Sequence, residues 1–152
     1  MVSQYGKQFY QQAAQQYEDL LADQAQKAVQ MSQFNARLRQ LWKDVVVDFP
    51  VLQTEGQLRV GDEIQISVLV NLGEIKPEEV AVELCYGPPK TVDRLEETYR
   101  EPMIVLEELS GNRYLYGCRM PCDTAGRYGF TARVTPKGDI WVRYTPGLIS
   151  WA

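Results

Sequence analysis

The stretch EIQISVLVN, residues 63–71, has isoleucine or valine at every second position, and most of the positions between them are polar. In an extended chain successive side chains point to opposite faces, so these four apolar residues share one face. They are Ile64, Ile66, Val68 and Val70. An apolar period of two predicts a β-strand with one buried face.

Three later stretches have the same alternation, at residues 80–86, 114–120 and 128–135. Glycine-, proline-, asparagine- and aspartate-containing turns separate them. The sequence Ser110-Gly111-Asn112 predicts a hairpin between strands near 102–109 and 113–120. About seven short strands after residue 45, with no helix expected between them, indicate a mainly β fold, an antiparallel β-sandwich of immunoglobulin type.

Tyr128 supports the immunoglobulin-like assignment. The sequence Asp123-Thr124-Ala125-Gly126-Arg127-Tyr128 precedes a predicted strand and resembles a tyrosine corner, although its spacing is one residue longer than in antibody domains. Phe130 stands where those domains have a cysteine, so the antibody disulfide is not expected. The three cysteines, Cys85, Cys118 and Cys122, are an odd number and are expected to be reduced thiols.

Residues 1–44 have a different composition, with eleven glutamines, no proline and one glycine. Apolar residues recur there at spacings of three and four, which is typical of amphipathic helices. One helix of this length would span about 66 Å, so we expect a break near Ala22-Asp23, where Asp23 and Gln26 suit a capping box. We therefore predict helices near 2–21 and 24–43, a helical segment at 1–44 and a β domain at 45–152. The glutamine-rich surface is either a solvated face or a partner-binding, coiled-coil face.

The charge differs between the two parts. Residues 1–44 carry five basic and four acidic side chains, a net charge of +1, whereas residues 45–152 carry eleven basic and sixteen acidic ones, a net charge of −5. An acidic β part repels nucleic-acid phosphates, so nucleic acid is not an expected partner. No apolar run approaches the roughly 18 residues of a membrane span, and the first residues lack the features of a signal peptide. We expect a cytoplasmic chain that does not bind a membrane.

The chain contains no histidine. This absence excludes catalytic Ser-His-Asp and Cys-His sites and removes the commonest metal ligand. Glu96-Glu97 and Glu107-Glu108 are adjacent pairs, and neighbours on a strand point to opposite faces, so neither pair can converge on a glycosidic bond. Cys118 and Cys122 lack the two-residue spacing of a zinc knuckle. We therefore expect no catalytic, cofactor-binding or metal-binding residue in this chain.

Three aromatic residues, Trp141, Tyr144 and Trp151, lie near the C-terminus. Exposed aromatic rings of this kind stack on sugar rings in carbohydrate-binding modules. The same residues could instead cover the sandwich or contact a neighbouring domain. Both interpretations remain open at this stage.

Four stretches of the chain match one family in order and spacing. They are MVSQYGKQFYQQAA (residues 1–14), LW (41–42), LGEIKPEEVAVELCYG (72–87) and GRYGFTARVTP with the ending GLISWA (126–136 and 147–152). Together they resemble the C-terminal region of the bacterial α-glucan (maltodextrin) phosphorylase family, and the resemblance covers nearly the whole chain. Gln11-Gln12 depart from the family, which often has a proline before the two alanines.

The resemblance implies a parent glycosyltransferase that uses pyridoxal phosphate and inorganic phosphate to cleave α-1,4-glucan to glucose 1-phosphate. The family's cofactor lysine and glucan-binding residues lie upstream of the matching region, so no catalytic residue is carried over and no cofactor is expected in this chain. The resemblance thus implies a non-catalytic accessory or structural domain whose helices pack on the catalytic domain of the parent chain. A glucan-binding module that uses Trp141, Tyr144 or Trp151 is the alternative, and a homo-oligomer is a further candidate assembly.

Overall fold

A computed structural model of the chain describes residues 26–53, 59–91, 94–95, 98–122, 126–138, 140–143 and 145–152. The chain divides into two compact units, residues 1–37 and 38–152. Helix α2 spans Gln26–Leu41 and is followed by a 3-10 turn, η2, at Trp42–Asp44. This helix confirms the second predicted helix, although it ends at Leu41 and not at 43. The first predicted helix, 2–21, and the break at Ala22-Asp23 lie outside the described residues, and the boundary at 44/45 remains a prediction.

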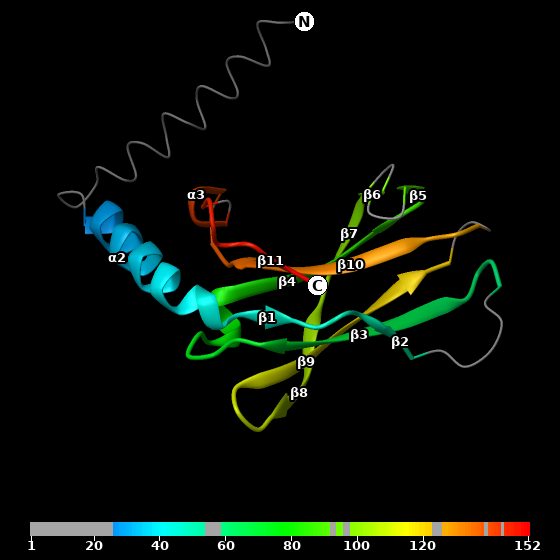
Figure 1. Ribbon diagram of the computed structural model, residues 1–152, viewed down its shortest axis with the longest axis horizontal. Coiled ribbons are helices and arrows are strands. Elements are labelled where there is room, and N and C mark those ends of the chain that lie inside the picture. The colour runs from blue at the N-terminus through cyan, green and yellow to red at the C-terminus, as the bar shows by residue number, and fades with distance from the viewer. Residues whose placement is uncertain are drawn as a thin grey trace, which may run out of the picture. The chain divides into compact units, whose positions relative to one another are not determined.

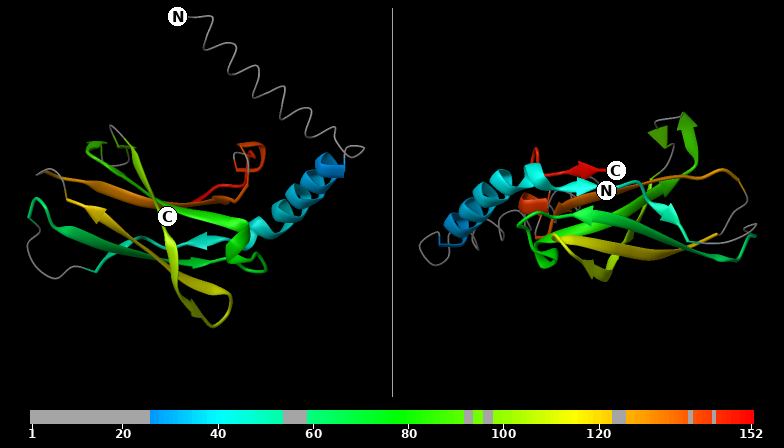
Figure 2. Two further views of the ribbon diagram at one scale, coloured as in Figure 1. Left: turned by 180° about the vertical axis from the view of Figure 1, so that it is seen from behind. Right: turned by 60° about the horizontal axis from the view of Figure 1, so that its bottom comes forward.

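Two antiparallel sheets make up most of the second unit. Sheet A has the order β1 (Val46–Val47), β3 (Glu63–Asn71), β9 (Arg113–Pro121) and β8 (Ile104–Leu109), and β2 (Val51–Leu52) also pairs with β3. Sheet B has the order β11 (Ser150–Trp151), β10 (Gly129–Pro136), β4 (Val80–Gly87) and β7 (Tyr99–Pro102). A small ribbon pairs β5 (Pro89–Thr91) with β6 (Arg94–Leu95). Figure 1 and Figure 2 show sheets A and B as two layers that face each other.

The core lies between the two sheets and confirms the predicted alternation. Most inward positions of the four longest strands are buried and hold the residues that alternate in the sequence, whereas Tyr86 on β4, Cys118 on β9 and Phe130 on β10 are only half-buried. The buried set includes Ile64, Ile66, Val68, Val70, Val80, Val82, Leu84, Tyr114, Tyr116, Met120, Ala132 and Val134. Removing this much apolar surface from water is the main favourable contribution to folding. The mainly β, two-sheet architecture is therefore confirmed.

The predicted strand at 102–109 is divided between the two sheets. Pro102 is the last residue of β7 in sheet B, and β8 in sheet A begins only at Ile104. Between them the Met103 N–H donates to the Val82 carbonyl at 2.9 Å, and the Met103 side chain is buried. The chain thus changes sheets at Met103. The β8–β9 hairpin itself is confirmed, with Gly111 and Asn112 at positive φ in its turn.

The described residues contain eleven strands and not about seven, because two-residue strands such as β1 and β11 are too short to show an alternation. The expectation of no helix between the strands is also wrong. A 3-10 turn, η3, occupies Pro77–Glu79, and a short helix, α3, occupies Ile140–Arg143. Neither is long enough to show a helical period.

The immunoglobulin-like subtype and its tyrosine corner remain predictions. Residues 123–125 of the corner lie outside the described part of the chain, and Tyr128 lies immediately before β10. Within the described ranges, no helix combines the length and the apolar character needed to cross a bilayer.

Candidate functional site

The outer face of sheet B, which is the face turned away from sheet A, carries a cluster of three charged side chains. Glu83 on β4 and Arg133 on β10 are direct cross-strand partners. The Arg133 Nε donates to Glu83 Oε2 at 2.8 Å, and Arg133 Nη2 lies 2.7 Å from the same oxygen. The other carboxylate oxygen, Oε1, accepts a hydrogen bond from Arg143 Nη2 on α3. One carboxylate therefore holds two guanidinium groups and ties α3 to the sheet.

Burial makes this cluster sensitive to the loss of any member. The side chain of Arg133 is 6% exposed and that of Glu83 is 12% exposed. Burial by itself raises the pKa of the Glu83 carboxyl, but the hydrogen bonds and positive charges of Arg133 and Arg143 outweigh it and hold that pKa below its ordinary value. Glu83 is therefore ionised at neutral pH. Both oxygens of this buried carboxylate are engaged by guanidinium groups, so the cluster forms a structural tie between β4, β10 and α3.

Trp151 on β11 extends the cluster to the edge of the sheet. It pairs with Arg133 in the sheet register, and the Arg133 guanidinium carbon lies over its ring at 5.7 Å from the centroid, in a cation–π arrangement. The Trp151 side chain is nevertheless 51% exposed. A half-exposed indole next to a fixed cation offers an aromatic surface to a ligand or a neighbouring domain.

The other two predicted stacking residues are Trp141 and Tyr144. Trp141 belongs to α3, but its side chain is not among those described, and Tyr144 lies outside the described residues. Stacking on a glucan by Trp141, Tyr144 and Trp151 stays a prediction.

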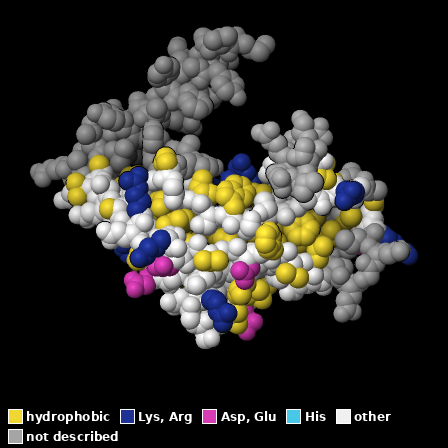
Figure 3. All heavy atoms as spheres, viewed as in Figure 1, with side chains coloured by type: hydrophobic (Ala, Val, Ile, Leu, Met, Phe, Trp, Pro, Cys, Tyr) yellow, Lys and Arg dark blue, Asp and Glu magenta, His cyan; other side chains and the backbone are white. Residues whose placement is uncertain are grey.

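An apolar edge adjoins Trp151. Strand β1 of sheet A lies beside β11 of sheet B, and Val46 and Phe49 at this edge are 53% and 80% exposed. Figure 3 shows hydrophobic side chains gathered across the middle of this view, over β1, β10 and β11. Solvent-exposed apolar residues in a group indicate a surface that contacts another molecule or domain.

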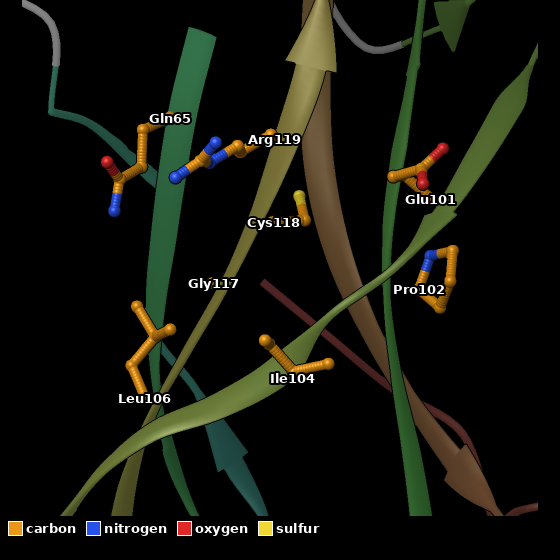
Figure 4. A pocket seen from close by; sticks show the side chains of 8 residues that line it. All are labelled: Gln65, Glu101, Pro102, Ile104, Leu106, Gly117, Cys118 and Arg119. Atoms are coloured by element: carbon orange, nitrogen blue, oxygen red, sulfur yellow. The ribbon is translucent and has the colours of Figure 1, made fainter.

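A pocket of about 500 Å³ lies next to sheet A. Figure 4 shows its lining side chains, which come from β3, β7, β8 and β9 and include Glu101 and Cys118. Burial, with a further contribution from the negative charge of Glu101, raises the pKa of the Cys118 thiol to about 11. A thiol that stays protonated at neutral pH is a poor nucleophile. The Cys118 thiol in the wall of this pocket is therefore protonated and weakly nucleophilic at neutral pH.

The adjacent glutamates Glu107 and Glu108 do not point to a common site. Glu107 and Glu108 on β8 pair with the successive residues Leu115 and Tyr114 of β9, so they point to opposite faces of sheet A. Glu96-Glu97 lies outside the described residues. In the part of the chain that the structure describes, no group of three or more His, Cys, Asp or Glu side chains could hold a metal ion, and the three cysteines are free thiols.

Sequence reasoning missed the Glu83–Arg133–Arg143 cluster. A signal was present, because Glu83 and Arg133 occupy outward positions within strands that have no other charged residue. A charged residue in such a strand often faces a charged partner across the sheet. Identifying that partner required the register between β4 and β10, because Glu83 and Arg133 are 50 positions apart in the chain.

Comparison with known proteins identifies the family. A profile of the family described as "Glycogen phosphorylase C-terminal domain" matches residues 42–152. The chain is 26% identical over 160 aligned positions to a maltodextrin phosphorylase of Thermococcus litoralis, covering 99% of this chain and 18% of that protein. It is 22% identical to glycogen phosphorylases of Mycobacterium bovis and Mycobacterium tuberculosis, covering 90% of this chain and 16% of each of them.

The chain thus spans less than a fifth of the length of the curated relatives it matches. The matched range begins at Trp42, in the η2 turn, and contains both sheets of the sandwich. This chain belongs to the family of glycogen phosphorylase C-terminal domains.

Proposed function

We propose that the chain is the non-catalytic C-terminal accessory part of an α-glucan phosphorylase. The observation that carries this proposal is the family match over residues 42–152 together with the small share of each relative that the chain spans. In the complete enzyme the sandwich would buttress the catalytic domain or its oligomer, and the N-terminal helices would pack on that domain. The enzyme would work in the cytoplasm on α-1,4-glucan and inorganic phosphate, without nucleic acid as a partner.

Pyridoxal phosphate belongs to the parent enzyme under this proposal and not to this chain. The cofactor needs a lysine for its Schiff base and donors for its phosphate. The pocket beside sheet A is lined by Gln65, Glu101, Arg119 and apolar or small residues, with no lysine among them. These residues do not fit the cofactor, so we assign it no place in this pocket.

Deletion is the direct test of the accessory role. Removing the region equivalent to residues 42–152 from the complete phosphorylase is expected to lower its melting temperature and to change its sedimentation, because an interface of the catalytic domain would be uncovered. The isolated chain, supplied with pyridoxal phosphate, phosphate and maltoheptaose, is expected to form no glucose 1-phosphate. Turnover by the isolated chain, or an unchanged enzyme after the deletion, would contradict the proposal.

The second candidate function is glucan binding at Trp151, which the 51% exposure of its indole favours. Titration of the chain with maltoheptaose, followed by tryptophan fluorescence and calorimetry, tests it. Saturable binding that is lost in Trp151→Ala would support a glucan-binding module. No response at millimolar sugar would remove this candidate and leave the accessory role in place.

A further inference from the structure

The outer face of sheet A, turned away from sheet B, is apolar at its centre. Leu69 on β3 and Leu115 on β9 are direct cross-strand partners on this face. In the next row of the sheet Val51 on β2 and Ile104 on β8 flank two small central residues, Ser67 and Gly117. The outward face of an antiparallel sheet is usually polar when water covers it. The apolar composition of this face is instead typical of a sheet face that another domain or molecule covers.

A β-bulge shapes the same face into a groove. The register between β8 and β9 shifts between Val105 and Glu107, so Leu106 is the extra residue. The Leu106 side chain lies over Gly117, where a Cβ atom would collide with its Cδ1. The pocket of about 500 Å³ lies beside this contact and includes Ile104, Gln65 and Arg119 in its wall. Figure 4 shows Leu106 and Ile104 on either side of Gly117. The hollow could accept a side chain of a partner.

Exposure and charge on this face follow the pattern of a protein interface. Val51, Ile104 and Leu106 are 60%, 68% and 46% exposed. Charged residues lie around them, including the exposed ion pair of Glu63 with Arg119, whose closest nitrogen and oxygen are 3.5 Å apart. An apolar centre that charged residues surround is the usual composition of an interface between protein surfaces.

We propose that the outer face of sheet A is the surface that packs against the catalytic part of the phosphorylase. This inference rests on the proposed function. More than four fifths of the Thermococcus litoralis relative lies outside the region that this chain matches, so a large partner surface is available within one polypeptide. The outer face of sheet B is the less suitable side, because the chain's own α3 lies against β10 there and is tied to Glu83.

Cysteine labelling compares this face in two contexts. Ile104→Cys and Val51→Cys are introduced separately into the complete phosphorylase and into the isolated chain, and the rate of reaction with a maleimide is measured for each. Val60→Cys is the matched control, because Val60 is 59% exposed but lies in the turn before β3 and outside the sheet. The unsubstituted proteins give the background from Cys85, Cys118 and Cys122. Exposed positions such as these tolerate substitution, and circular dichroism checks that each variant is folded.

The expected result is labelling at least tenfold slower at positions 104 and 51 in the complete enzyme than in the isolated chain, with similar rates at position 60. Equal rates at 104 and 51 in both contexts would overturn the inference. If the deletion described above still lowers the enzyme's stability, the accessory role survives that outcome and another surface serves it. If labelling at positions 104 and 51 of the isolated chain becomes slower as the concentration of the chain rises, a second copy covers the face. That result would also overturn the inference.

Discussion

The two outer faces of the sandwich differ although their inner faces are built alike. On sheet B the chain covers part of its own surface, because α3 lies against β10 and Arg143 reaches Glu83, while Trp151 at the edge of the sheet stays 51% exposed. On sheet A the apolar side chains of Val51 and Ile104 stay more than half exposed to solvent. The inner faces decide that a sandwich forms, whereas the outer faces decide what contacts it. Substitutions on the outer face of sheet B, which we call the closed face, and on the outer face of sheet A, the open face, test this difference.

Loss of the Glu83 charge should have the largest effect. Glu83→Gln leaves two guanidinium groups together, one of them almost completely buried, and is expected to lower the free energy of unfolding by about 3 kcal/mol. Urea unfolding of the isolated chain measures this. Glu63→Gln is the matched control on sheet A, where the ion pair with Arg119 is exposed, and should change stability by less than about 0.5 kcal/mol. Equal effects of the two substitutions would contradict a distinction between a closed and an open face.

The same carboxylate should make stability depend on pH. The folded-state pKa of Glu83 lies below its unfolded value of 4.5, so its contribution is fully present above pH 4.5 and is lost as the pH falls through the folded-state pKa. The stability difference between the unsubstituted chain and Glu83→Gln should therefore be constant from neutral pH down to pH 4.5 and shrink below it. Urea midpoints at several pH values provide the measurement. If the stability difference instead shrank as the pH rose above neutral, the folded-state pKa of Glu83 would lie above its unfolded value, and the assignment would be wrong.

Trp151 should contribute less than Glu83. Trp151→Ala removes a cation–π contact with Arg133 and the buried half of an indole, and is expected to destabilise the chain by about 1 kcal/mol. Thermal unfolding measures the change. Trp151→Phe keeps an aromatic ring over the guanidinium and should recover part of the loss. If Ala and Phe variants are equally stable, the aromatic contact contributes nothing measurable.

The open face should tolerate a charge in the isolated chain. Val51→Glu and Ile104→Glu place a carboxylate where the side chain is already 60% or more exposed, so each should change the free energy of unfolding by less than about 0.5 kcal/mol. Chemical denaturation of the isolated chain checks this. A loss above about 1.5 kcal/mol would mean that these side chains are part of the chain's own core.

The sequence by itself determined the inner faces and excluded several kinds of chemistry. Alternation at residues 63–71 and 80–86 needs only the geometry of one extended chain, so β3 and β4 were predicted without any knowledge of their neighbours. The absence of histidine likewise follows from composition, and the family resemblance from order and spacing along the chain. None of these properties depends on how distant parts of the chain pack together.

Only the tertiary structure decided the outer faces. Glu83 meets Arg133 because β4 and β10 pair in one particular register, and Arg143 joins them because a short helix folds back over the sheet. Leu106 lies over Gly117 because one extra residue bulges from β8. Each contact joins residues between 11 and 60 positions apart. The physical reason is that side-chain alternation depends on neighbouring peptide units, whereas pairing across a sheet depends on the packing of the whole domain.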